Sequence, residues 1–197
     1  MLTYWLEGNF FLRKIISCDV LLNVIVDLVD RLNYNTYHLY EGKIFMFADK
    51  KERYVIFDID GTIANIEHRQ HLLKQHPRDW VTFKKRIPLD TPHHDIIWLL
   101  KILSTFTRIF IVTGREGSEE DRKSTVDWLH RHDVVFEELH MRPAEDYRDD
   151  SIIKREILAK LRAQHGEPIM VFDDRDRVVE MWRQEGVRCL QVAPGDF

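Results

Sequence analysis

Cysteine is almost absent from this sequence, and the marks of export are missing. Only Cys18 and Cys189 occur among 197 residues, and neither lies in a Cys-x-x-Cys or Cys/His cluster. This favours free thiols in a reducing compartment over a disulfide framework or a zinc site. No basic segment precedes the apolar residues of the N-terminus, and the most apolar stretch, residues 20–29, is short and contains Asp27. We therefore expect neither a signal peptide nor a membrane span, and a cytoplasmic protein.

An excess of positive charge is also lacking. The net charge is −4, which argues against a strongly basic nucleic-acid coat but allows a local basic groove. A hydrophobic content of 44% and a charged content of 31% are typical of a soluble globular protein. A chain of this length can bury a core in one domain, with room for a small appendage.

Residues 1–50 contain no motif that carries chemistry. Apolar residues recur at helical spacing between Leu21 and Leu32, which predicts an amphipathic helix, and residues 37–47 predict two short strands around Glu41-Gly42. This N-terminal α+β extension packs against the main domain in the simplest interpretation. A dimerisation element and a partner-binding arm are the alternatives, and the oligomeric state stays open.

Residues 54–62 combine a predicted buried strand with an acidic site. Four apolar or aromatic residues run into Asp58 and Asp60, and Gly61-Thr62 follows at once. Side chains two apart in a strand point the same way, so both carboxylates can reach one small volume. Two carboxylates that close repel each other and need a cation, a shared proton or a basic partner. A strand followed by a turn with solvated acids is the alternative interpretation.

From residue 54 onward, apolar strands alternate with amphipathic helices. Such alternation predicts right-handed crossovers and an α/β fold with a Rossmann-like, mostly parallel sheet. In such sheets the site lies at the carboxyl ends of the strands. The expected strands are 54–58, 108–112, 134–139, 169–172 and 187–192, and the expected helices lie near 94–104, 118–131, 151–164 and 175–185.

The second predicted strand is followed by Thr113-Gly114-Arg115. A hydroxyl, a glycine that admits close approach of the backbone, and a helix N-terminus capped by Ser118 suit an anionic oxygen ligand. Taken alone, this stretch is equally typical of an ordinary turn.

Charged residues also accompany the last two strand–helix units. Asp173-Asp174 follows the fourth strand, and Ser151 as a helix N-cap would place Lys154 in the first turn. The helix dipole disfavours a cation there, and a nearby anion would remove that penalty. A helix cap and a solvated lysine are the ordinary explanations, but polar chemistry at several strand ends of one alternating chain favours a site.

Together, Asp58-x-Asp60-Gly61-Thr62, Thr113-Gly114-Arg115, Lys154 and Asp173-Asp174 resemble the four motifs of the haloacid-dehalogenase-like (HAD) phosphohydrolases. Residues 54–197 are similar, more narrowly, to the 3′-phosphatase domain of phage-type polynucleotide kinase/phosphatase. The most similar stretches are 141–143, 146–148, 173–175, 178–183 and 191–197.

This resemblance implies a HAD-like phosphatase domain over residues 51–197, with a small helical cap insert at about 64–92 and residues 1–50 outside it. No GxxxxGK[ST] motif occurs in the chain, so kinase activity is not expected. A phage-type origin would place the protein in the host cytoplasm.

The resemblance also assigns the chemistry of the acidic residues. Asp58 would be the nucleophile that forms an aspartyl-phosphate, and Asp60 the general acid and then base. Mg²⁺ would be held by Asp58, the backbone carbonyl of Asp60 and Asp173, with Asp174 close by, because a hard cation seeks oxygen ligands.

Phosphate contacts fall on a second group of residues. Thr113, the Gly114 amide and Lys154 would hold the phosphoryl oxygens as charge develops on them. Arg69 follows the first motif at a place where the similar phosphatase domains carry a phosphate-binding arginine, and a solvated helix-face arginine is the alternative. Arg115 lies directly beside the phosphate-binding stretch and could reach a backbone phosphate.

Short insertions leave no room for a large cap, and an open site suits the end of a polymer. The insert carries basic and aromatic residues that could track a nucleic-acid backbone and stack a base. A solvated basic helix face explains the same residues equally well. They are Arg78, Trp80, Phe83, Lys84, Lys85 and Arg86.

The sequence thus predicts a Mg²⁺-dependent phosphomonoesterase acting on DNA or RNA 3′ ends, with a separate kinase or ligase as an open partner. A nucleotidase or small-metabolite phosphatase is the first alternative. A binding or inhibitory protein on the same fold, using residues 1–50 as its partner surface, is the second.

Overall fold

The computed structural model describes residues 38–40, 43–45 and 53–195, and the chain divides into two compact units, Met1–Ala48 and Asp49–Phe197. In the first unit, β1 (His38–Tyr40) pairs antiparallel with β2 (Lys43–Phe45). The strands expected around Glu41-Gly42 are therefore present. The predicted helix between Leu21 and Leu32 lies outside the described residues.

A five-stranded sheet forms the centre of the second unit. Its order is β7-β6-β3-β8-β9, and every neighbouring pair is parallel, which confirms the predicted α/β fold. The middle strand carries the acidic stretch, so its carboxyl end opens between two neighbours. The five strands are β3 (Tyr54–Phe57), β6 (Arg108–Glu116), β7 (Glu138–Arg142), β8 (Val171–Asp173) and β9 (Cys189–Gln191).

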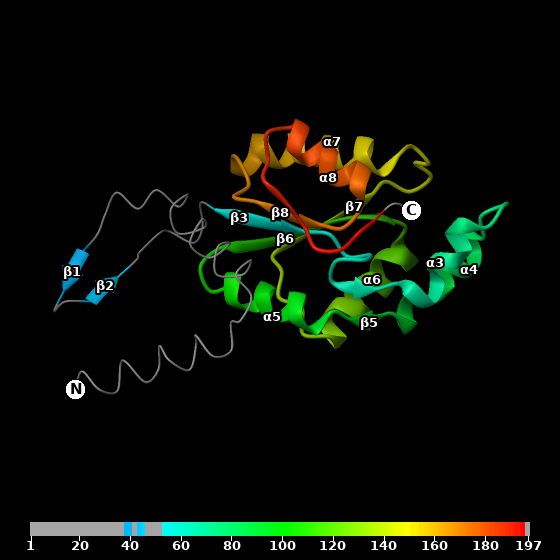
Figure 1. Ribbon diagram of the computed structural model, residues 1–197, viewed down its shortest axis with the longest axis horizontal. Helices are drawn as coiled ribbons and strands as arrows, with labels where there is room; N and C mark the ends of the chain where they lie inside the picture. The colour runs from blue at the N-terminus through cyan, green and yellow to red at the C-terminus, as the bar shows by residue number, and fades with distance from the viewer. Residues whose placement is uncertain (1–37, 41–42, 46–52, 196–197) are drawn as a thin grey trace. The chain divides into compact units, whose positions relative to one another are not determined.

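Helices cover both faces of this sheet, as Figure 1 shows. On one face, Ile56 and Phe110 pack with Leu158 and Trp182 from two of the helices in a fully buried core. No helix of the described residues is long and apolar enough to cross a membrane. The helices of this face are α7 (Asp150–His165) and α8 (Asp176–Gln184), and those of the opposite face are α5 (His94–Leu103) and α6 (Glu119–Arg131).

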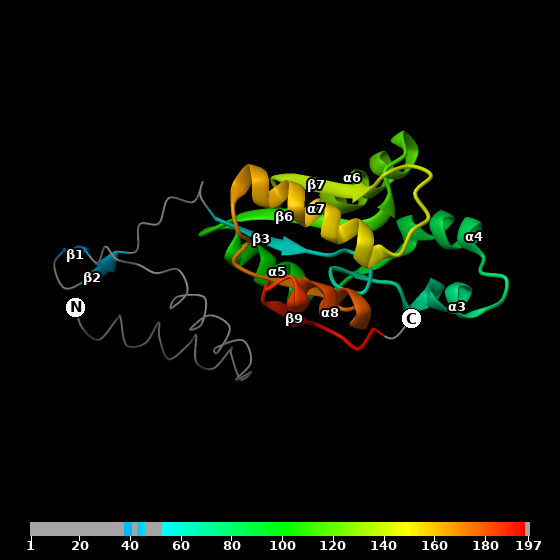
Figure 2. The same cartoon turned by 90° about the horizontal axis from the view of Figure 1, so that it is seen from above.

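A small helical insert follows the first strand of the sheet. Two short antiparallel strands, β4 (Ala64–Asn65) and β5 (Thr91–Pro92), close its base. Both views place the insert beyond the carboxyl end of β3 (Figures 1 and 2). It therefore lies at the edge of the sheet where the site is expected. The insert contains α3 (Glu67–Lys74), α4 (Trp80–Lys85) and the 3-10 turn η2 (Ile87–Leu89).

Two of the predicted strands differ from the observed ones by up to four residues at an end, and the other three differ by at most two. The third was expected at 134–139, but β7 begins only at Glu138. Val134 instead closes the end of α6, donating its backbone N–H to Leu129, and Val135 is half exposed. The second was expected to end at 112, but β6 continues to Glu116, with an irregular register after Thr113. Pairing with β7 carries this strand past the predicted turn.

Candidate active site

A tight turn at the end of β3 forms the floor of the site. Gly61 has a φ of +90°, a conformation that glycine adopts at no steric cost, and its backbone N–H donates to the Ala64 carbonyl at 2.8 Å. A Cβ atom at this position would lie 2.0 Å from Oδ2 of Asp174. The glycine therefore admits a close approach of the two acidic motifs, which are far apart in the sequence.

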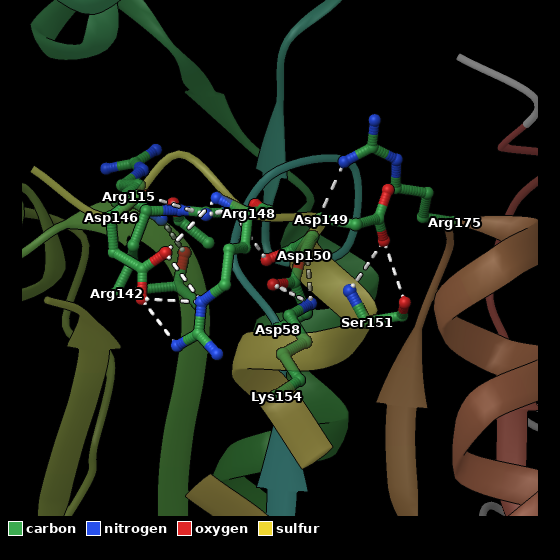
Figure 3. A network of polar contacts seen from close by, with 12 residues as sticks. Asp58, Arg115, Arg142, Asp146, Arg148, Asp149, Asp150, Ser151, Lys154 and Arg175 are labelled. Carbon is green, nitrogen blue, oxygen red and sulfur yellow. Dashed lines mark hydrogen bonds and ion pairs between the residues drawn. The ribbon is translucent and has the colours of Figure 1, made fainter. Parts of the chain in front are cut away.

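Lys154 reaches from α7 into the carboxylates at this edge (Figure 3). Its ammonium lies 2.7 Å from Asp58 Oδ1, 2.8 Å from Asp173 Oδ2 and 3.6 Å from Asp150 Oδ2, and the side chain is 1% exposed. Burial disfavours the charged ammonium, but these three carboxylates raise the pKa of Lys154 well above its ordinary value. The lysine is therefore a fixed positive charge beside Asp58.

Two of the carboxylates that contact this ammonium also belong to a cluster of three. One oxygen each from Asp58, Asp173 and Asp174 lies within 4.8 Å of the others, and all three residues are buried. Burial, and the repulsion of the neighbouring carboxylates, raise the pKa of Asp58 well above its ordinary value, although Lys154 opposes the shift. Burial and Asp173 raise the pKa of Asp174 to about 7.

This donor set fits a divalent cation. A single ammonium leaves three buried carboxylates with an excess of negative charge, and Mg²⁺ prefers such oxygen ligands. The structure thus brings together three of the four carboxylates expected at the metal site, whereas the Asp60 side chain has other partners.

Asp60 is held by two arginines. Arg69 Nη2 donates to its Oδ1 at 2.5 Å, and Arg115 donates through Nη2 to Oδ1 at 2.7 Å and through Nε to Oδ2 at 3.0 Å. Burial alone would raise the pKa of Asp60, but the charges and hydrogen bonds of Arg115 and Arg69 bring it below the ordinary value. Without a ligand, this carboxyl group is therefore ionised.

Asp90, which sequence reasoning did not select, anchors both arginines from behind. It accepts hydrogen bonds from Arg69 Nε and Nη2, both at 2.6 Å, and from Arg115 Nη2 at 3.0 Å. Its backbone carbonyl accepts from the indole of Trp128 in α6 at 2.9 Å. The residue lies in the loop before β5 and no motif marks it. The only signal in the sequence is that Asp90 is an acidic residue at the end of the insert, which is equally typical of a solvated side chain.

Each of these guanidiniums keeps one buried donor without a partner. Among the described residues, Nη1 of Arg69 and Nη1 of Arg115 make no hydrogen bond. A buried unpaired donor is costly, and a charged one more so. An anionic oxygen ligand in the neighbouring cavity would satisfy the donor of Arg115, which lines that cavity, but not the donor of the fully buried Arg69, which does not.

Thr113 and Gly114 lie beside this cluster in β6. The Thr113 hydroxyl accepts the backbone N–H of Arg115 at 3.2 Å and is fully buried. A Cβ at Gly114 would lie 2.4 Å from Asp150 Oδ1, so glycine is needed for α7 to approach. A cavity of about 500 Å³ is lined by Asp58, Asp60, Gly114 and Arg115, whereas Thr113 does not line it.

The N-terminus of α7 differs from the sequence-based expectation. Asp149, not Ser151, caps the helix, because its Oδ1 accepts both the backbone N–H of Ser151 at 2.9 Å and its hydroxyl at 2.7 Å. The helix therefore starts at Asp150, which moves Lys154 out of the first turn. Asp150 lies four residues before Lys154 and supplies part of the anionic surroundings.

Two expected nucleic-acid contacts in the insert have other partners. Phe83 is buried, with the Arg69 guanidinium carbon 4.1 Å from its ring centroid. Lys84 forms ion pairs with Glu116 and with Asp121. Lys84 thus ties the insert to β6 and α6, whereas Phe83 packs against Arg69 within the insert. Both side chains therefore have partners within the protein rather than the expected nucleic-acid contacts.

Solved structures similar to this chain share the HAD hydrolase fold. A haloacid-dehalogenase-like family protein from Streptococcus pneumoniae superposes with a TM-score of 0.50 at 16% identity, over 72% of this chain and 84% of that protein. A chain of the Pnkp1/Rnl/Hen1 RNA repair complex superposes with a TM-score of 0.62 at 27% identity, over 84% of this chain and 48% of that chain. The class of the fold is therefore that of HAD hydrolases.

Within that class the family is also defined. Residues 52–197 match the sequence model of the polynucleotide kinase PNKP phosphatase domain, and the chain belongs to this family. A candidate bifunctional polynucleotide kinase/RNA ligase of Autographa californica nuclear polyhedrosis virus is 29% identical over 137 residues, which are 69% of this chain and 18% of that protein. The chain thus spans less than half of the length of the repair-complex chain and of this viral relative.

Proposed function

We propose that this protein is a Mg²⁺-dependent phosphomonoesterase that removes the 3′-terminal phosphate from DNA or RNA ends through an aspartyl-phosphate on Asp58. One arrangement carries the proposal. A carboxylate paired with a buried lysine and a carboxylate clamped by Arg115 line the same cavity. The two carboxylates are therefore held in different charge environments, as a nucleophile and a proton donor require.

Asp58, Asp173 and Asp174 would hold the Mg²⁺ ion, together with the backbone carbonyl of Asp60. When bound, the ion supplies positive charge that favours the ionised form of Asp58 and stabilises the charge of the phosphoryl group in flight. The raised pKa values of Asp58 and Asp174 support this assignment, since a cation reverses both shifts.

The chain's own groups perform the transfer. A carboxylate oxygen of Asp58 attacks phosphorus, the bond from phosphorus to the 3′ oxygen breaks, and Asp60 gives its proton to that oxygen. Asp60 then takes a proton from water as the water attacks the aspartyl-phosphate, which releases phosphate and restores Asp58. Lys154 and the Gly114 amide stabilise the oxygens of the phosphoryl group.

Asp60 must be protonated for the first step, although Arg69 and Arg115 hold it ionised in the ligand-free protein. A phosphomonoester with a charge of about −1.5 to −2 at neutral pH competes for the guanidinium of Arg115, which lines the cavity and whose Nη1 group is unpaired. As Arg115 turns to the phosphate, the pKa of Asp60 rises. Substrate binding thus prepares the proton donor.

Phosphate release in the presence of Mg²⁺ tests the proposal. The substrates are a 3′-phosphorylated oligonucleotide, its 5′-phosphorylated counterpart and free nucleoside monophosphates. We expect preference for the 3′ end, and no turnover by Asp58→Asn or Asp173→Asn, both of which should still unfold cooperatively in urea. Preference for monophosphates would instead make the protein a nucleotidase, and turnover by Asp58→Asn would refute the covalent intermediate.

The biological setting is part of the same proposal. One similar chain belongs to a complex described as an RNA repair complex, and the viral relative is described as a kinase/ligase. We infer that this phosphatase prepares 3′ ends together with a separate kinase or ligase, and that it works in the cytoplasm.

A further inference from the structure

The candidate cavity is larger than a phosphate group requires. Its volume of about 500 Å³ falls in the range of pockets that take ligands the size of a nucleotide or larger. Its lining continues from Asp58 outward to two exposed aromatic side chains, Trp80 of the insert and Tyr147 of the loop before α7. The reaction at phosphorus uses neither.

Tyr147 is an exposed ring on a fixed backbone. The side chain is 87% exposed and has no hydrogen bond, ion pair or ring contact within the described residues. Arg142 nevertheless donates from Nη1 to the carbonyls on either side of it, to Asp146 at 3.0 Å and to Arg148 at 2.6 Å (Figure 3). Arg148 is itself held by Glu156 through two hydrogen bonds at 2.6 and 3.0 Å.

Trp80 is the matching feature on the insert. It is 48% exposed, and one part of its ring meets Phe83 edge to face at a centroid distance of 5.9 Å. Phe83 in turn packs against the guanidinium of Arg69, which holds Asp60. The indole thus packs, through Phe83, on the arginine that positions the proton donor Asp60. Arg78, two residues earlier, lines the same cavity and has no ion pair within the described residues.

Resting on the proposed function, we propose that Trp80 and Tyr147 are stacking platforms for the last nucleosides of a single-stranded 3′ end. Exposed aromatic faces beside a cationic group are how proteins hold unpaired bases without reading their sequence. In a blunt duplex only the outer face of the terminal base pair is open, and the bases behind it are stacked on both faces, so two platforms cannot both be used. The substrate class is therefore an unpaired polynucleotide end rather than a blunt duplex.

A cycle of protein and substrate changes tests this inference. Phosphate release is measured for the wild type, Trp80→Ala and Tyr147→Ala on three 3′-phosphorylated single strands. One strand is intact, one lacks the terminal base and one lacks the penultimate base. We expect each alanine variant to raise KM for the intact strand by about 5- to 150-fold, the effect of one lost stack. On the strand that lacks the base stacked by the replaced residue, the KM of the variant should be close to that of the wild type.

Three controls separate stacking from general damage. Trp80→Phe and Tyr147→Phe keep a ring and should restore most of the affinity. Trp98→Ala removes a tryptophan that is 43% exposed on α5 and does not line the cavity, and it should leave KM unchanged. A blunt duplex should be used less well than the same strand alone.

The outcomes distinguish this inference from the proposed function. If the wild type releases phosphate from the oligonucleotides but the alanine variants match it, or lose equally on all three strands, the stacking platforms are refuted and the phosphatase stands. Equal use of the blunt duplex also refutes the preference for unpaired ends. If the wild type releases phosphate from none of the strands, the proposed function fails and the inference with it.

Discussion

Asp174→Asn should make the protein more stable and less active. The Asp174 carboxylate is buried, lies close to Gly61, and forms no ion pair with any described residue. Without a metal its charge is therefore a burden on the folded state. Asparagine has nearly the same shape and carries no charge, so it removes this burden while leaving the packing against Gly61 in place.

The size and sign of the effect follow from the pKa of Asp174. Burial and the charge of Asp173 raise it from 3.8 to about 7. Below pH 3.8 the carboxyl group is neutral in the folded and the unfolded state, so the protein has its full stability there. As pH rises towards 7 the unfolded chain ionises first, so the free energy of unfolding falls. A shift of about three pKa units at about 1.4 kcal/mol each gives a loss of about 4 kcal/mol by pH 8.

Equilibrium urea unfolding at pH 4, 6 and 8, each in EDTA and in Mg²⁺, measures this effect. In EDTA the variant should equal the wild type near pH 4 and exceed it by up to about 4 kcal/mol at pH 8. Mg²⁺ should stabilise the wild type at pH 8 and the variant much less, because ligand binding to the folded state adds RT ln(1 + [L]/Kd). A stability difference that does not change with pH, or a variant weaker than the wild type at pH 8, would refute the reasoning.

Three further predictions concern α7. Lys154→Met removes the cation between Asp58 and Asp173, and should cost about 3–5 kcal/mol in urea unfolding at pH 8 and at least about 100-fold in kcat for phosphate release; wild-type stability would contradict this. Gly114→Ala places a Cβ 2.4 Å from the Asp150 carboxylate of α7 and should cost about 1–3 kcal/mol, with a smaller loss contradicting the need for glycine. Asp149→Ala should cost about 1 kcal/mol of unfolding free energy between pH 5 and 8 by loss of the cap. The pKa of Asp149 is lowered to about 2, so protonation removes this contribution only below about pH 4. Asp149→Asn keeps the cap, and equal losses in both variants would contradict the assignment.

The sequence predicted the sheet and the meeting of its acidic motifs because both depend on strong local patterns. Apolar runs such as residues 54–57 are long enough to mark strands, and parallel strands bring their carboxyl ends to one edge. Asp58, Lys154 and Asp173 therefore meet as expected. Their catalytic roles rest on the family resemblance and stay predictions.

Other parts of the site depend on tertiary contacts that no local pattern shows. The extension of β6 to Glu116 is decided by its pairing with β7. Asp90 belongs to the site only because Arg69 of α3 and Arg115 of β6 both form ion pairs with it. Asp149 and Ser151 are both good capping residues, and only the geometry of the loop determines which of them caps α7.

The buried tryptophan of α8 makes the site accessible to fluorescence spectroscopy. Trp182 is fully buried in α8, and its indole Nε1 donates to Oδ2 of Asp173 at 3.1 Å. The indole is thus bonded directly to a carboxylate of the proposed cation cluster, where an arriving dication would be the largest change in local charge. Its ultraviolet emission is an intrinsic reporter of that event, and comparison with Trp182→Phe isolates its signal from the other four tryptophans. Binding of the proposed cation should therefore be measurable by tryptophan fluorescence, without label, substrate or turnover.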